Sequence, residues 1–136
     1  MTVTVNPGII FIMKNTAIRG KYLPKQTYKY SGNVNRITYR SMWERRFMLY
    51  CDRSNKILKW SSEELHIPYI SPKDNKWHNY YPDFMVETYD GRTIMVEIKP
   101  HHQKKHKVNI AKWKYAQDYC DQHGYEFKVL TEKELF

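Results

Sequence analysis

The chain has 136 residues, enough for one domain with a buried core. Its 41% hydrophobic and 15% aromatic residues exclude disorder over most of the length, and no apolar run approaches the roughly 18 residues of a membrane span. Lysine and arginine total 23 against 14 aspartates and glutamates, and this net charge of +9 favours a polyanionic partner such as nucleic acid. A basic surface that serves only solubility is the alternative.

The N-terminal part, residues 1–36, is expected to be a basic arm that is extended or partly disordered, ahead of a folded domain at 37–136. Residues 1–12 carry no charged side chain, and Met13 is a second candidate for the start of translation. Turn formers such as Gly20 and Pro24 follow among basic residues and tyrosines, which favours an extended arm over a packed element.

The first regular element is expected to be an amphipathic helix over residues 41–53. Apolar side chains recur there at helical spacing, namely Trp43, Phe47 and Tyr50. Short β-type runs follow at 57–60 and 65–69, and the polar stretch 71–75 is typical of a turn.

The next segment reads as a β-hairpin. A strand is predicted from His78 to Glu87, with Pro82 tolerated at an edge or a bulge. Asp90-Gly91 is a strong hairpin signal, and it leads into an alternating apolar strand over 93–99 that Pro100 ends.

The C-terminal part predicts a helix over about 104–123 with Gly124 as its stop, then a strand at 126–130. Thr131 could cap a last helical turn. The resulting order α-β-β-β-α-β is that of a mixed α/β domain with a mixed sheet flanked by helices. Cys51 and Cys120 have no disulfide or metal-ligand spacing, so they are expected to be reduced thiols of a cytoplasmic protein.

Two acids and a lysine are expected to meet beside this hairpin. Asp83 lies seven residues before the turn and Glu97 six after it, and Glu97 and Lys99 share one face of their strand. Two carboxylates can hold a Mg²⁺ ion, for which Mn²⁺ may substitute, and a lysine beside them can orient the attacking water. The backbone carbonyl of Ile98 is a candidate further metal ligand. The pattern suits hydrolysis of phosphodiester bonds, and its alternative is a surface salt-bridge network.

The motif Tyr81-Pro82-Asp83 followed by Glu97-Ile98-Lys99 resembles the PD-(D/E)XK signature of restriction-endonuclease-like nucleases. The resemblance implies that fold for residues 37–136, and it implies catalytic roles for Asp83, Glu97 and Lys99. In this superfamily a glutamate on the first helix often completes the metal site, which implies a catalytic and metal-binding role for Glu44. A capping box Ser41-Met42-Trp43-Glu44 is the competing interpretation, in which Glu44 only binds the start of the helix.

A closer resemblance runs from near Gly20 to the C-terminus. The chain is similar to the head completion nucleases of T4-type tailed phages and, more distantly, to the catalytic domain of TnsA-type transposon endonucleases. The motifs that carry it are Arg40-Ser41-Met42-Trp43-Glu44, Trp60-Ser61-Ser62-Glu63-Glu64, Ile67-Pro68-Tyr69, Tyr80-Tyr81-Pro82-Asp83-Phe84 and Glu97-Ile98-Lys99-Pro100. The resemblance implies a nuclease that acts on packaged DNA in the host cytoplasm, with portal or neck proteins as candidate partners and the virion as a second location.

Several basic and polar residues are expected to contact DNA phosphates, because most of them directly follow the predicted active strand. They are Arg40, His101, His102, Gln103, Lys104, Lys105 and Lys107. A solvated helix start is the plain alternative for this basic run, and a zinc site with His106 is a further one.

Two other functions compete with that of a Mg²⁺-dependent nuclease of double-stranded DNA. The first is a non-catalytic DNA-binding or structural head-neck protein that retains the nuclease fold. The second, a transposase subunit, would want an additional partner-binding domain. No membrane partner is expected.

Overall fold

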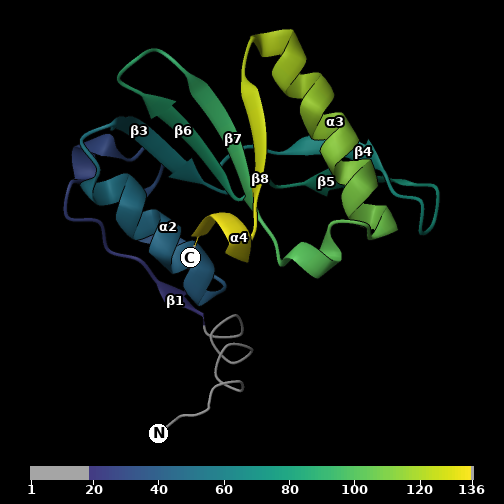
Figure 1. The fold of residues 1–136 in the computed structure, drawn as a ribbon, viewed down its shortest axis with the longest axis horizontal. Coiled ribbons are helices and arrows are strands. Elements are labelled where there is room, and N and C mark those ends of the chain that lie inside the picture. Colours follow the sequence, from purple (N-terminus) through teal and green to yellow (C-terminus); the bar gives the residue numbers. More distant parts are fainter. Residues whose placement is uncertain (1–18, 136) are drawn as a thin grey trace, which may run out of the picture.

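The computed structural model describes residues 19–135, and its centre is a four-stranded sheet of order β3-β6-β7-β8 (Figure 1). β6 runs antiparallel to both β3 and β7, whereas β8 runs parallel to β7. The strands span Ile57–Ser62 (β3), Phe84–Thr88 (β6), Thr93–Ile98 (β7) and Glu126–Leu130 (β8). The predicted hairpin is therefore the β6–β7 pair, with Asp90-Gly91 in its turn.

Two long helices, α2 (Met42–Arg53) and α3 (Lys107–His123), flank the sheet (Figure 1). They pack on it through different apolar clusters. Side chains alternate between the two faces of a strand, and β7 shows this directly. Val96 and Ile98 belong to the cluster with α2, whereas Met95 packs with Ala116 of α3. Because Glu97 lies two residues beyond Met95, its side chain leaves the sheet on the α3 side.

Capping residues explain where the helices begin and end. The Ser41 hydroxyl accepts from the Glu44 N–H at the start of α2, and Gly124 ends α3 in the left-handed conformation (φ 72°). α3 begins three residues later than predicted, because residues 101–103 form a 3-10 turn (η3) and His106 caps the helix. The predicted last turn is confirmed as α4 (Glu132–Leu135), which follows Thr131.

The prediction of one continuous strand from His78 to Glu87 is wrong, because the chain passes from one sheet to another within this segment. β5 (Trp77–Tyr80) pairs with β4 (Ile67–Ile70) in a separate hairpin, and β6 begins only at Phe84. The break falls at Pro82, which has no N–H for a sheet ladder. This crossing places Asp83 directly before the first residue of β6.

The segment before α2 packs on the core, where the sequence favours an extended arm. It contains β1 (Gly20–Lys21), η1 (Thr27–Lys29), η2 (Val34–Arg36) and β2 (Thr38–Tyr39). Tyr22 and Tyr30 are buried against Trp60, with ring centroids 6.0 and 4.8 Å away. Asp52 of α2 accepts from the Tyr22 hydroxyl at 2.8 Å. The expectations for residues 1–18, including the start at Met13, lie outside the described residues.

The predicted fold class is confirmed. The four-stranded sheet and its two long helices follow one another as α2, β3, β6, β7, α3 and β8, which is the expected order α-β-β-β-α-β, and the β4–β5 hairpin is inserted into it. This arrangement is consistent with a restriction-endonuclease-like fold. Between residues 19 and 135, none of the helices has the length and apolar character needed to cross a membrane.

Candidate active site

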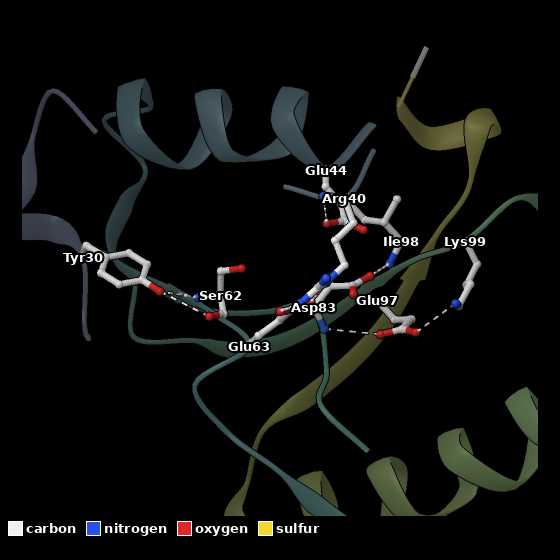
Figure 2. Close-up of polar contacts among 9 residues, drawn as sticks. All are labelled: Tyr30, Arg40, Glu44, Ser62, Glu63, Asp83, Glu97, Ile98 and Lys99. Carbon is white, nitrogen blue, oxygen red and sulfur yellow. Dashed lines mark hydrogen bonds and ion pairs between the residues drawn. The ribbon is translucent and has the colours of Figure 1, made fainter. Parts of the chain in front are cut away.

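Asp83 and Glu97 face each other where β6 and β7 begin to separate. The register pairs Phe84 with Val96, so Asp83 and Glu97 are the next residues along the two strands. The Asp83 N–H donates to Glu97 Oε1 at 3.3 Å, and the Ile98 N–H donates to Asp83 Oδ2 at 2.8 Å (Figure 2). Beyond the last ladder pair, backbone N–H groups therefore hold the two carboxylates in place.

Glu97 is the more enclosed of the two acids, with 3% of the residue exposed. The hydroxyl of Tyr80, which is equally buried, donates to Glu97 Oε1 at 2.8 Å. On its other oxygen, Oε2, Glu97 faces the Lys99 ammonium at 3.9 Å (Figure 2). The expected proximity of Asp83, Glu97 and Lys99 is thus present.

Glu44 approaches this pair from the first turn of α2. Its Oε1 accepts from the Arg40 N–H at 3.0 Å (Figure 2), and its own N–H donates to the Ser41 hydroxyl. Half of the capping box is therefore formed, with the Glu44 carboxylate bonded one residue before Ser41. The capping role and the metal role remain compatible, because a carboxylate bonded through one oxygen retains acceptor capacity.

The three acids are electrostatically costly to ionise together. Burial raises the pKa of Asp83 well above its usual range, and the charges of Glu97 and Glu44 raise it further. Burial also raises the pKa of Glu97, against the opposing charge of Lys99. For Glu44, burial is again the main cause of a raised pKa. A bound cation would relieve this repulsion, since it favours the ionised form of each carboxylate.

The donor set fits a hard divalent cation held by few protein ligands. Within residues 19–135, no group of three or more His, Cys, Asp and Glu side chains is arranged to hold a metal ion. Mg²⁺, however, is usually held by one or two carboxylates plus water and substrate phosphate oxygens. Asp83 and Glu97 supply two adjacent carboxylates. The metal roles of Asp83 and Glu97 stay predictions, as do those of Glu44 and of the Ile98 carbonyl.

Two residues near the acids were not among the predicted site residues. Tyr80 bonds Glu97, and Glu63 donates its N–H to the Asp83 carbonyl at 3.2 Å. Glu63 has a positive φ of 54°, and its carboxylate binds the Arg40 guanidinium through two hydrogen bonds of 2.9 and 3.0 Å. Both residues lie in motifs that carry the family resemblance, which was the available signal. Their partners are distant in sequence, so local spacing could not assign their contacts.

The residues predicted to contact DNA lie in two places, and their role in DNA binding stays a prediction. Arg40 lines a polar hollow of about 510 Å³ together with Lys21 and Arg36. The basic run follows Lys99-Pro100 directly through η3 into α3, and most of its side chains are exposed: His101, His102, Lys104, Lys105 and Lys107, with Gln103 half-buried. The Gln103 carbonyl accepts from the Asn109 side chain at 3.0 Å, which ties the run to α3.

Comparison with known proteins agrees with this geometry. A family model described as "TnsA-like endonuclease N terminal" matches residues 54–132, a range that includes Asp83, Glu97 and Lys99. The head completion nuclease of Enterobacteria phage T4 is 33% identical over 141 residues, which cover 88% of this chain and 94% of the phage protein. The match therefore extends over α2 and the site as well as the sheet. The chain belongs to the family of TnsA-like endonucleases, and it is a nuclease.

Proposed function

We propose that this nuclease hydrolyses phosphodiester bonds of double-stranded DNA and depends on Mg²⁺, for which Mn²⁺ can substitute. The observation that carries the proposal is the meeting of Asp83, Glu97 and Lys99 at the open end of the β6–β7 pair. Raised pKa values on adjacent carboxylates are typical of sites that bind a cation or catalyse a reaction.

Asp83 and Glu97 would hold the cation, with the Ile98 carbonyl and Glu44 as further ligands, directly or through water. A cation in that place supplies a Lewis acid that polarises the scissile phosphate and lowers the pKa of a bound water. Lys99, held 3.9 Å from Glu97 Oε2, orients the attacking water and offsets the negative charge that develops on the phosphate. The 2.8 Å hydrogen bond from the Tyr80 hydroxyl fixes the orientation of the Glu97 carboxylate beside the proposed cation site.

The substrate class follows from charge. The exposed basic run after Lys99 offers His101, His102, Lys104, Lys105 and Lys107 to phosphates, and Gln103 lies among them. Arg40 is a further candidate contact, from the polar hollow that it lines with Lys21 and Arg36, although Glu63 binds its guanidinium in the free protein. Phosphate contacts of this kind position a duplex without reading its sequence, so we expect cleavage with little sequence preference.

We assign the activity to head completion in a tailed phage, because the T4 relative bears that name and covers nearly the whole chain. The enzyme would act on packaged DNA in the host cytoplasm before tails join. Portal or neck proteins are the proposed partners, and association with the virion is a second proposed location. The competing function is a DNA-binding head-neck protein that does not cleave.

The test is cleavage of linear and circular duplex DNA with Mg²⁺, Mn²⁺ or EDTA. Wild type is compared with Asp83→Ala and Lys99→Ala. The matched control is Glu87→Ala, which removes an exposed acid farther along β6. We expect metal-dependent cutting by wild type and the control, and none by the two site variants. Wild-type protein that binds duplex but never cuts it, with site variants that bind alike, would overturn the catalytic proposal in favour of the head-neck protein.

A further inference from the structure

A lysine stands on the core-facing stripe of α3, where an apolar residue would be expected. Positions four apart on a helix lie on one face. Three members of this row pack in the second apolar cluster, namely Val108, Ala116 and Cys120, and the fourth is Lys112. A charged residue on such a stripe needs a compensating partner or a function.

The groups in direct contact with the Lys112 ammonium are aromatic faces, whereas the Glu97 and Asp83 carboxylates act on it from beyond ion-pair distance. Its Nζ lies 5.9 Å from the ring centroid of Tyr69 and 5.6 Å from that of Tyr80, within the range of cation–π contacts. Within residues 19–135 this ammonium makes no ion pair and no hydrogen bond. Its three N–H donors are therefore available to a ligand.

The ammonium lies next to the candidate active site. Tyr80, over whose ring Lys112 sits, donates its hydroxyl to Glu97. Partial burial lowers the pKa of Lys112, as does the charge of Lys99, whereas Glu97 and Asp83 act in the opposite direction. Lys112 thus approaches the acids from α3, while Lys99 approaches them from β7.

We propose that Lys112 is a further substrate-contacting residue, which donates hydrogen bonds to a phosphate oxygen of the DNA strand bound at this site. The inference rests on the proposed function, because it needs DNA at the acids. Tyr69 and Tyr80 hold the ammonium in place without neutralising it, so that it remains free to pair with phosphate. Lys112 also continues along α3 from the exposed basic run, which offers the preceding contacts to the same strand.

The test uses the salt dependence of binding of a short labelled duplex in Ca²⁺, with gels to check that the duplex stays intact. Lys112→Met keeps the apolar stem and a sulfur that packs on aromatic rings. Loss of one phosphate contact should reduce the magnitude of the slope of log K against log salt by about 0.9, and binding at moderate salt should weaken about tenfold. Lys114→Met, an exposed lysine two residues along α3, should keep the wild-type slope, as should the charge-preserving Lys112→Arg.

A folded Lys112→Met protein with the wild-type slope overturns the inference, because a purely structural lysine would leave the number of phosphate contacts unchanged. If Lys112→Met does not fold, Lys112→Gln replaces it with the same expectation. Wild type that cleaves DNA while Lys112→Met keeps its slope refutes this inference alone. Wild type that neither binds nor cuts duplex refutes the proposed function, and the inference with it.

Discussion

Removing one hydroxyl group tests whether Glu97 works as a metal ligand. Tyr80→Phe deletes the 2.8 Å hydrogen bond to Glu97 Oε1 but keeps the ring over which Lys112 lies. The remaining donor to that oxygen is the Asp83 N–H at 3.3 Å, which is long for such a bond. Because both Tyr80 and Glu97 are 3% exposed, water cannot readily replace the hydroxyl.

The size of the effect follows from this geometry. A hydrogen bond to a charged group contributes about 1.5–3 kcal/mol, which corresponds to about a tenfold to hundredfold change in affinity. Hydrogen bonds to metal-ligating carboxylates have the same range of effects on metal affinity. The Tyr80 hydroxyl also lowers the pKa of Glu97 against the larger effect of burial. Its loss raises that pKa further, so a higher pH is needed to ionise Glu97.

The assay is the initial rate of duplex cleavage as a function of Mg²⁺ concentration at several pH values. We expect the half-saturating Mg²⁺ concentration of Tyr80→Phe to rise about tenfold to hundredfold, and the acid limb of the rate profile to move to higher pH. Tyr69→Phe is the control, since it removes a buried tyrosine hydroxyl from the other ring beside Lys112. An unchanged Mg²⁺ requirement and an unchanged acid limb in Tyr80→Phe would refute the role of Glu97 as a ligand held by Tyr80.

Three further substitutions test stability. In EDTA, wild type should lose stability as pH rises from 3.8, the ordinary pKa of the Asp83 carboxyl, through its raised pKa in the folded state. In that range the folded state holds a proton on Asp83 that the unfolded state has released. Asp83→Asn lacks this charge, so urea unfolding should find it more stable than wild type at pH 8 and the two alike in acid. Asp52→Ala should cost about 3 kcal/mol in urea unfolding at pH 7, because Asp52 accepts from the Tyr22 hydroxyl and from two backbone N–H groups. Burial raises the pKa of Asp52, but these hydrogen bonds outweigh it and lower the pKa overall. The stabilisation by Asp52 should therefore be lost from wild type as pH falls through this lowered pKa. Equal stability of wild type and Asp52→Ala at pH 7 would contradict the stabilising role of Asp52. Gly124→Ala should lower the free energy of unfolding by about 1–2 kcal/mol, measured as a lower melting temperature, because φ at this position is 72°. The cost is one of backbone strain, since an added Cβ would meet nothing within 4 Å.

Local patterns were sufficient to predict that Asp83, Glu97 and Lys99 lie close together. The turn at Asp90-Gly91 and the alternation of β7 together fix which residues stand opposite each other, and counting outward from the turn brings Asp83 to Glu97. The boundaries of α2 and β8 also follow from nearby residues, since capping and periodicity are local properties.

Contacts between distant segments could not be predicted in the same way. Residues 78–87 alternate as one strand would, yet they belong to two sheets, because a period of two does not reveal a change of partner at Pro82. Tyr22 and Tyr30 have the sequence surroundings of an extended arm, but both pack against Trp60, which follows them by 38 and 30 positions. Lys112 likewise depends on rings from β4 and β5.

The crossing at residues 80–83 has a consequence for engineering. It carries both Tyr80 and Asp83, so the number of residues between them sets the spacing of two groups that hold Glu97. The tip of the β4–β5 hairpin, residues 71–76, lies at the opposite end of β5 and is mostly exposed. A DNA-recognition domain could therefore be inserted at this tip to direct cleavage to a chosen DNA sequence. A single residue inserted in the crossing would instead separate the Tyr80 hydroxyl from the Asp83 N–H, which both bond Glu97.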